Sequence, residues 1–158
     1  MKALTNKKGV SYILTCVIIL VCVLVIAVAM QYAYIYHVAR DQQNETQLKL
    51  DSYITKYSIQ YYDAFKQGEA YENYIDRDDI VDGAYTLLGF PRIINLVYIE
   101  SPGVEGKYVM ERPTIYAMAG DSIGVYVKYD ILIPFEMFGY ELTQIRVPIE
   151  IVSKITQK

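Results

Sequence analysis

The sequence contains no tryptophan, a single histidine and only two cysteines, and these scarcities exclude several kinds of chemistry. With His37 alone, the chain cannot build a histidine-based catalytic triad or a cluster of histidine metal ligands. Both cysteines, Cys16 and Cys22, lie in an apolar N-terminal stretch, so the rest of the chain offers neither a disulfide nor a thiolate zinc site. Glycine-rich phosphate loops are also missing. We therefore expect no enzymatic activity, no cofactor and no metal centre.

The densest acidic patch consists of Asp76, Asp78, Asp79 and Asp82. An EF-hand calcium loop begun at Asp78 would place Ile80 at its third position and Gly89 at its twelfth, where oxygen ligands are needed. We interpret the patch as the solvated, capped start of a helix. A weak calcium site is the alternative.

Basic residues are scarce relative to acidic ones beyond residue 30. All 18 Asp and Glu residues lie there with 12 of the 15 Lys and Arg residues, whereas Lys2, Lys7 and Lys8 precede the apolar stretch. A surface with this excess of acidic residues does not favour binding to nucleic acid, because proteins bind its phosphates through Lys and Arg. We expect no nucleic-acid partner.

Glycine and proline are absent from Val10 to Gln67, and charge is absent from Val10 to Met30. An apolar stretch of about 20 residues is long enough to span the bilayer as a helix. The lysines on its N-terminal side place the N-terminus in the cytoplasm and the residues after Gln31 outside. We predict a short basic cytoplasmic leader over residues 1–9, a single-pass transmembrane helix over 10–30 and an extracytoplasmic remainder.

A cleaved signal peptide is the competing interpretation, because Ala27-Val28-Ala29 has the small-x-small pattern of a cleavage site. The apolar part of a signal peptide usually runs 7–15 residues, and this stretch is longer. We therefore favour a retained membrane span.

Residues 31–67 should continue the same helix outside the membrane. The segment from Arg40 to Gln47 reads as polar on all sides, which is typical of a helix that crosses solvent or packs against neighbours. Apolar residues then recur every three or four positions and predict one buried helical stripe. This head-packing stripe comprises Leu50, Ile54, Tyr57, Tyr61 and Phe65.

Residues 68–158 are expected to form an α/β head domain. A short helix should begin at Asp78 or Asp79 and stop at Gly89. Strand patterns follow at 93–100, 107–111, 123–131 and 145–152, with a loop over Pro134–Gly139 between the last two. Pro148 indicates an edge strand or a bulge. The expected fold class is α+β, a long N-terminal transmembrane-plus-amphipathic helix packed against a small C-terminal antiparallel sheet of three or four strands.

A basic leader ending Lys7-Lys8-Gly9, an apolar helix that starts directly after this glycine, and a C-terminal sheet together resemble type IV pilin-like proteins. Gly9-Val10-Ser11-Tyr12 before the span, with Gln31-Tyr32 after it, is similar to the TadE/TadG-like pseudopilins of tight-adherence (Tad) pili. The resemblance implies cleavage after Gly9, before Val10, by a prepilin peptidase, and packing of the apolar helix among other pilin-like or pilus-assembly subunits. Prepilins usually carry glutamate five residues after the glycine, where this chain has Leu14. This departure favours a minor or accessory subunit.

Four small or polar residues mark the expected assembly helix, because they let neighbouring helices approach closely. They are Ser11, Thr15, Ala27 and Ala29. The predicted function is thus that of a non-catalytic, membrane-anchored minor pilin or pseudopilin in a Tad or type IV-like pilus or secretion filament. The alternative is a membrane-tethered extracytoplasmic binding, sensor or adhesin domain.

Overall fold

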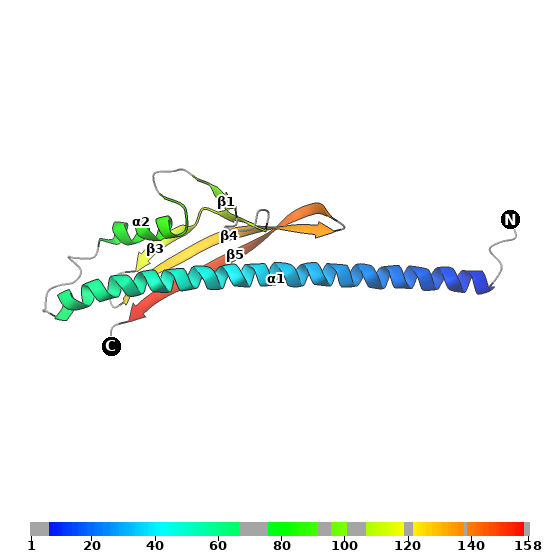
Figure 1. Cartoon of the computed structure of the whole chain (residues 1–158), viewed down its shortest axis with the longest axis horizontal. Coiled ribbons are helices and arrows are strands. Elements are labelled where there is room, and N and C mark those ends of the chain that lie inside the picture. Colours follow the sequence, from blue (N-terminus) through cyan, green and yellow to red (C-terminus); the bar gives the residue numbers. More distant parts are fainter. Residues whose placement is uncertain are drawn as a thin grey trace.

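The computed structural model describes residues 7–66, 76–91, 96–100, 107–118, 122–137 and 139–156. Within these ranges a long helix lies against a small antiparallel sheet, with a second, short helix beside it (Figure 1). The predicted α+β fold class is confirmed.

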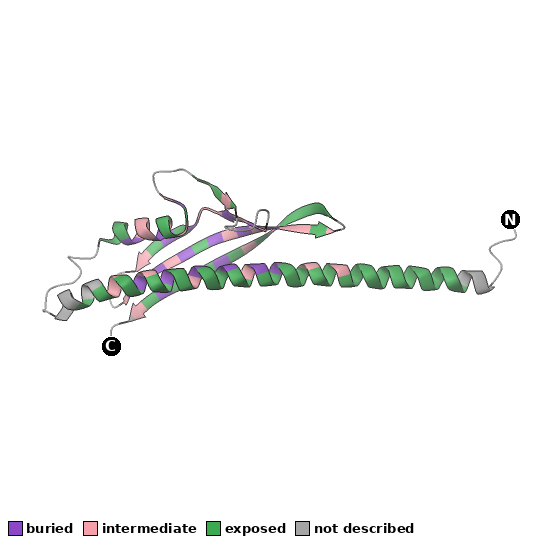
Figure 2. Ribbon diagram, viewed as in Figure 1, coloured by how far each residue is buried: buried purple, intermediate pink, exposed green. Residues whose placement is uncertain are grey.

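The long helix α1 runs without interruption over Lys7–Lys66, 60 residues that extend about 90 Å at the usual helical rise. No glycine or proline lies between Val10 and its last residue, so nothing in the sequence breaks its hydrogen bonds. Among the side chains of α1 that the structure describes, the buried ones run from Ile35 to Ile54 (Figure 2). The head therefore packs on the second half of the helix. The expected boundary at Gln67 lies outside the described residues.

The short helix α2 covers Arg77–Leu87. Its N-cap is Asp76, whose carboxylate accepts a 2.8 Å hydrogen bond from the backbone amide of Asp78. The expected cap at Asp78 or Asp79 was wrong, because both residues lie in the first turn of the helix. There their negative charges interact favourably with the positive end of the helix dipole. The helix ends before Gly89, whose φ of +84° only glycine adopts without strain.

Contacts between α2 and α1 are close. The Tyr53 hydroxyl of α1 donates to the backbone carbonyl of Ile80 at 3.2 Å. Gly83 lies against the same tyrosine, and a methyl group at this position would overlap the Tyr53 hydroxyl. Ile80 and Ala84 are fully buried and join the common core. The absence of a side chain at Gly83 thus permits this helix contact.

The sheet is built around one long central strand. Its strands are β1 (Tyr98–Glu100), β2 (Val109–Glu111), β3 (Thr114–Met118), β4 (Ser122–Met137) and β5 (Tyr140–Thr156). β2 and β3 pair with successive parts of one edge of β4, while β5 pairs with the other edge along its whole length. All pairs are antiparallel. Within the described part of the chain β5 pairs only with β4, which confirms the edge position predicted from Pro148.

Three expectations about the strands need correction. The described residues contain five strands rather than three or four, because β3 was not predicted. The predicted loop over Pro134–Gly139 is largely strand, since apolar residues continue to alternate as far as Phe135 and only the residues around Gly139 (φ +81°) turn the chain. Of the strand predicted from residue 93, residues 93–95 lie outside the described ranges, and strand geometry begins at Tyr98.

The core lies between α1, α2 and one face of the sheet. Alternate residues of β4 from Ile123 to Ile133 are buried, and so are Ile149 and Ile151 on β5. They pack with Leu50 and Ile54 of α1 in one hydrophobic cluster. The opposite face carries surface ion pairs, Lys128 with Glu150 at 2.7 Å and Arg146 with Glu111 at 2.6 Å, which add little stability.

Candidate functional site

The first candidate surface is the apolar half of α1. Every described side chain from Ser11 to Met30 is exposed except Ala27, which is half-buried. Within the parts of the chain that the structure describes, α1 is the one helix long and apolar enough to cross a membrane. Exposing this many apolar side chains to water is unfavourable by roughly 25 cal/mol per Å². The segment therefore fits a single-pass membrane anchor.

The predicted assembly residues lie on this surface in different settings. The Thr15 hydroxyl donates a 2.9 Å hydrogen bond to the carbonyl oxygen of Ser11 in its own helix. Its proton is thus used within α1, and only its oxygen remains to accept a bond from a neighbour. Ala29 is exposed, whereas Ala27 is half-buried. The Gly9–Val10 bond, the predicted cleavage point, lies near the start of α1, where helix ends open most readily.

The region just above the apolar half is where α1 meets the head. Tyr32 and Tyr36 are exposed, and Tyr36 makes an edge contact with His37 at 6.0 Å between ring centroids. Tyr34 and Gln31 instead share a hollow of about 170 Å³ with Pro134 and Glu136 of β4. The sheet therefore reaches α1 already at this level.

A buried polar cluster joins α1 to the sheet. Gln42 and Thr46 are 9% and 2% exposed, and the Gln42 amide donates to the Thr46 hydroxyl at 3.3 Å. The Tyr108 hydroxyl donates to the Gln42 side-chain carbonyl, and the Tyr129 hydroxyl donates to Thr46 at 2.9 Å. A buried donor or acceptor of this cluster that lost its hydrogen-bond partner would destabilise the fold by about 1–3 kcal/mol. The cluster thus fixes the position of the head along α1.

The segment Arg40–Gln47 is polar on all sides, as expected, and of the two alternatives given for it, crossing solvent or packing, the structure shows packing. Gln42 and Thr46 are polar, but they occupy the buried face. The signal was present in the spacing, because Ile35, Val38, Gln42, Thr46, Leu50 and Ile54 follow one another at steps of three or four residues. Hydropathy alone concealed it, since two members of the stripe are not apolar.

The head-packing stripe lies partly within this contact. Leu50 and Ile54 are fully buried, and Tyr57 is half-buried with its ring 4.9 Å from that of Tyr53. The side chains of Tyr61 and Phe65 lie outside what the structure describes. The contact extends instead toward the membrane, through Ile35 and Val38.

Ionisation of the two buried tyrosines is suppressed. Burial raises the pKa of Tyr108 from its usual 10.0 to about 12, with smaller increases from the charges of Glu45 and Tyr129. Burial also raises the pKa of Tyr129, against the opposing effect of its hydrogen bonds to Thr46 and Gln42. Both hydroxyls are therefore neutral at physiological pH and able to donate their bonds.

A second polar contact lies further along α1. The Ser153 hydroxyl of β5 donates to the Asp51 carboxylate at 2.6 Å, and the Gln47 amide donates to the carbonyl oxygen of Val152 at 3.3 Å. Gln47 also donates to Asp51 at 2.9 Å. These bonds tie the edge strand β5 to α1.

One further cleft lies where α1, α2 and the short strands meet. Its volume is about 220 Å³, and its lining includes Gln42, Lys49, Leu88 and Tyr108. Sites for small ligands are usually larger, at about 300–1,000 Å³. The polar groups of Gln42 and Tyr108 are already bonded to each other. The cleft therefore offers a ligand few unused partners.

The acidic patch does not assemble a metal site in the described residues. Asp76 caps α2, and no group of three or more Asp, Glu, His or Cys side chains in the described ranges is placed to hold a metal ion. Cys16 and Cys22 are both free thiols on the exposed apolar half of α1.

Comparison of the chain with protein-family models, with curated proteins and with solved structures finds no match. The fold and the candidate surfaces define the chain as an α+β protein with one helix suited to a single-pass membrane anchor.

Proposed function

We propose that the chain is a membrane-anchored, pilin-like structural subunit, a minor pilin or pseudopilin, whose apolar helix packs among other subunits and whose head lies outside the cytoplasmic membrane. The observation that supports this most is that one unbroken helix forms both parts. Its first half is apolar and exposed, while its second half is fixed to the head by Gln42, Thr46 and the buried stripe.

A continuous helix fixes the position of the head relative to the membrane. A flexible linker would let an anchored domain turn freely, whereas here the bonds from Tyr108 and Tyr129 set the height and rotation of the head on α1. A tether alone needs no such rigidity. A subunit that must present its head in register with its neighbours does need it, and this requirement favours the structural role.

The lysines at positions 2, 7 and 8 support an orientation with the N-terminus in the cytoplasm. The resemblance of the Gly9–Val10 region to prepilins supports cleavage there by a prepilin peptidase. Mass measurement of the membrane-extracted protein distinguishes an intact chain, a start at Val10 and a start at Met30. The last result would refute the proposal, because it removes the anchor.

Cysteine crosslinking tests the assembly role. In a chain carrying Cys16→Ser and Cys22→Ser, cysteines introduced at Tyr32 and Tyr36 occupy exposed positions just above the span, 72% and 54% exposed. We expect both variants to crosslink to a second membrane subunit in cells that express the neighbouring machinery. Val38→Cys is the matched control, since Val38 is 3% exposed under the sheet and should not react.

Crosslinks at Tyr32→Cys or Tyr36→Cys, but not at Val38→Cys, would support packing among subunits. A complete lack of crosslinks at the exposed positions would favour an isolated tether. The second candidate function, a tethered binding or adhesin domain, would then take precedence, although the 220 Å³ cleft where α1, α2 and the short strands meet offers a small ligand few unused partners.

A further inference from the structure

The end of the β4–β5 hairpin points along α1 toward the apolar half of that helix. β5 runs in the same direction as α1, since Pro148 lies beside Ala39 and Ser153 bonds Asp51. The turn that precedes β5 is therefore the part of the sheet nearest the N-terminal end of α1, as Figure 1 shows.

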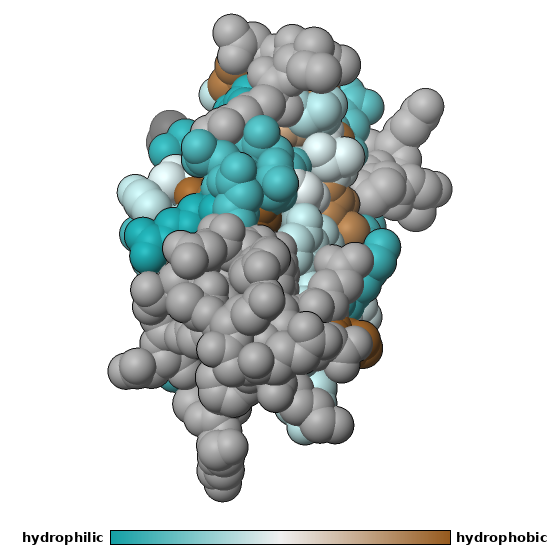
Figure 3. Space-filling model, turned by 90° about the vertical axis from the view of Figure 1, so that its left-hand side faces the viewer, coloured by the Kyte–Doolittle hydropathy of each residue, from teal (hydrophilic) through white to brown (hydrophobic). Residues whose placement is uncertain are grey.

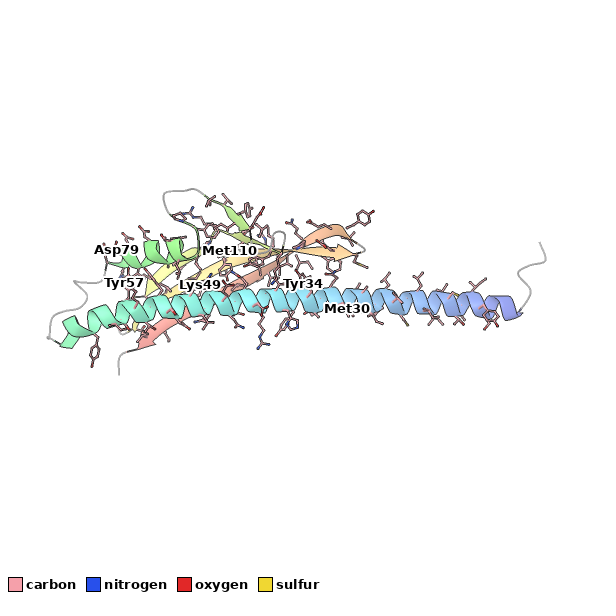
Figure 4. All side chains as sticks on the ribbon, in the orientation of Figure 1. Met30, Tyr34, Lys49, Tyr57, Asp79 and Met110 are labelled. Atoms are coloured by element: carbon pink, nitrogen blue, oxygen red, sulfur yellow. The ribbon has the colours of Figure 1, made fainter. Side chains whose placement is uncertain are left out.

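The level reached by this turn follows from the hollow described above. Glu136 of β4 lies level with Gln31 and Tyr34. Met137, the last residue of β4, adds about 3.3 Å of strand toward the turn, which equals about two residues of helix. The end of β4 is thus level with about Ala29–Tyr32, and Figure 4 shows Met30 beneath the end of the hairpin.

This level coincides with the edge of the predicted membrane. A span over residues 10–30 fills about 30 Å of hydrocarbon, and the headgroup layer then covers roughly the next 5–7 Å. Gln31 and Tyr34 fall in that layer, and the turn falls at its inner boundary.

The hairpin end has the composition of an interfacial anchor. Tyr140 is 75% exposed and Leu142 is 61% exposed, which is costly in water and favourable at a lipid interface. The opposite end of the head shows mainly hydrophilic or neutral described residues with separated hydrophobic patches (Figure 3), and the apolar side chains exposed there, such as Ile59 and Tyr62, lie far along α1 from the predicted membrane. Apolar exposure near the turn, in contrast, coincides with the level of the lipid headgroups.

We propose that the start of β5 at the end of the β4–β5 hairpin, Tyr140–Leu142, is a second membrane contact that inserts Tyr140 and Leu142 into the zwitterionic headgroup layer beside α1. This inference rests on the membrane anchoring in the proposed function, and it assigns a partner to a surface outside α1. It gives the molecule two points of attachment to the bilayer, which together limit tilting of α1 and the attached head relative to the membrane.

Charge near the turn selects the type of lipid surface. Glu136 and Glu141 are register partners across the hairpin, and no lysine or arginine occurs in the sequence from Ile131 to Ile145. Like charges directly opposite each other repel, so a cationic partner is favourable. Choline or ethanolamine ammonium groups of zwitterionic lipids supply it, whereas an anionic surface would add repulsion.

The absence of tryptophan makes the test direct. In full-length protein in phosphatidylcholine vesicles, Tyr140→Trp provides the only indole, and brominated acyl chains quench an indole that lies in the lipid. Tyr32→Trp, on α1 just above the span, is the reference for lipid contact. Tyr116→Trp is the matched control, because Tyr116 is 59% exposed and pairs with Tyr126, about 35 Å of strand away from the turn.

We expect Tyr140→Trp to be quenched and blue-shifted to the same degree as Tyr32→Trp, and Tyr116→Trp to emit as in water. A replacement of part of the phosphatidylcholine by phosphatidylglycerol should reduce the quenching of Tyr140→Trp.

Quenching of Tyr32→Trp without quenching of Tyr140→Trp would overturn the inference but leave the anchor. A blue shift of Tyr140→Trp without quenching would point to a second copy of the chain and also overturn it. Failure of quenching at Tyr32→Trp would overturn the anchor itself.

Discussion

Ile54 lies fully buried where α1 meets the sheet, while Lys56 is exposed on the same turn. Ile54→Ala removes buried methyl groups and leaves a cavity, so it should destabilise the head by about 2–5 kcal/mol. Lys56→Ala should change the free energy of unfolding by less than about 0.5 kcal/mol. Denaturant unfolding of the detergent-solubilised chain, followed by tyrosine fluorescence, measures both. Equal midpoints for the two variants would contradict the packing of α1 described above.

Tyr108 gives the head a specific sensitivity to alkaline pH. Its folded pKa of about 12 exceeds the unfolded value of 10.0, so the fold favours the neutral hydroxyl. The stabilisation is fully present below pH 10 and is lost as pH rises through about 12, on the order of 2–3 kcal/mol in total. Tyr108→Phe should be less stable at pH 8, because the Gln42 carbonyl loses its donor, but should lose less further stability above pH 10. Parallel curves for the two proteins between pH 9 and pH 12 would contradict this assignment.

The docking of α2 reverses the usual preference of a helix for alanine over glycine. Within a helix Gly→Ala normally stabilises by about 1 kcal/mol, but a methyl group at Gly83 would overlap the Tyr53 hydroxyl. We expect Gly83→Ala to lower the stability of the head in unfolding experiments. In a Tyr53→Ala background the same substitution should be neutral or stabilising, since the overlap is gone. If Gly83→Ala stabilises the chain that retains Tyr53, α2 does not pack as described.

Elements were predictable from the sequence where one periodicity extended over a long stretch. The absence of glycine and proline up to Gln67 indicated α1, and alternation from Ile123 onward indicated β4. β3 was missed because its five residues are too few for a clear alternation, and its pairing with β4 is a tertiary contact. The extent of the β4–β5 hairpin was underestimated because Pro134 was read as a loop residue, although strands accept proline where no ladder hydrogen bond is needed.

The arrangement of the whole molecule could be predicted only in outline. The sequence indicated an apolar helix that carries an α/β head, because the length of the apolar stretch and the bias of the lysines toward its N-terminal side can be read directly. The level at which the head sits on α1 could not be derived, since it depends on contacts such as Tyr108 with Gln42, 66 residues apart. That level decides where the β4–β5 turn lies relative to the bilayer.

The orientation of the molecule follows from the lysines at its N-terminus and can be tested in cells. With the head outside, protease added to intact cells stripped of their wall should digest the chain beyond Gln31 and leave a small membrane fragment that contains Val10–Met30. Arg40 offers a first exposed cleavage position for trypsin above the span. Mass spectrometry of the protected fragment locates its end. Survival of the full chain while a known exterior protein is digested would place the head in the cytoplasm, and with it the Tyr140 contact would move to the inner face of the membrane.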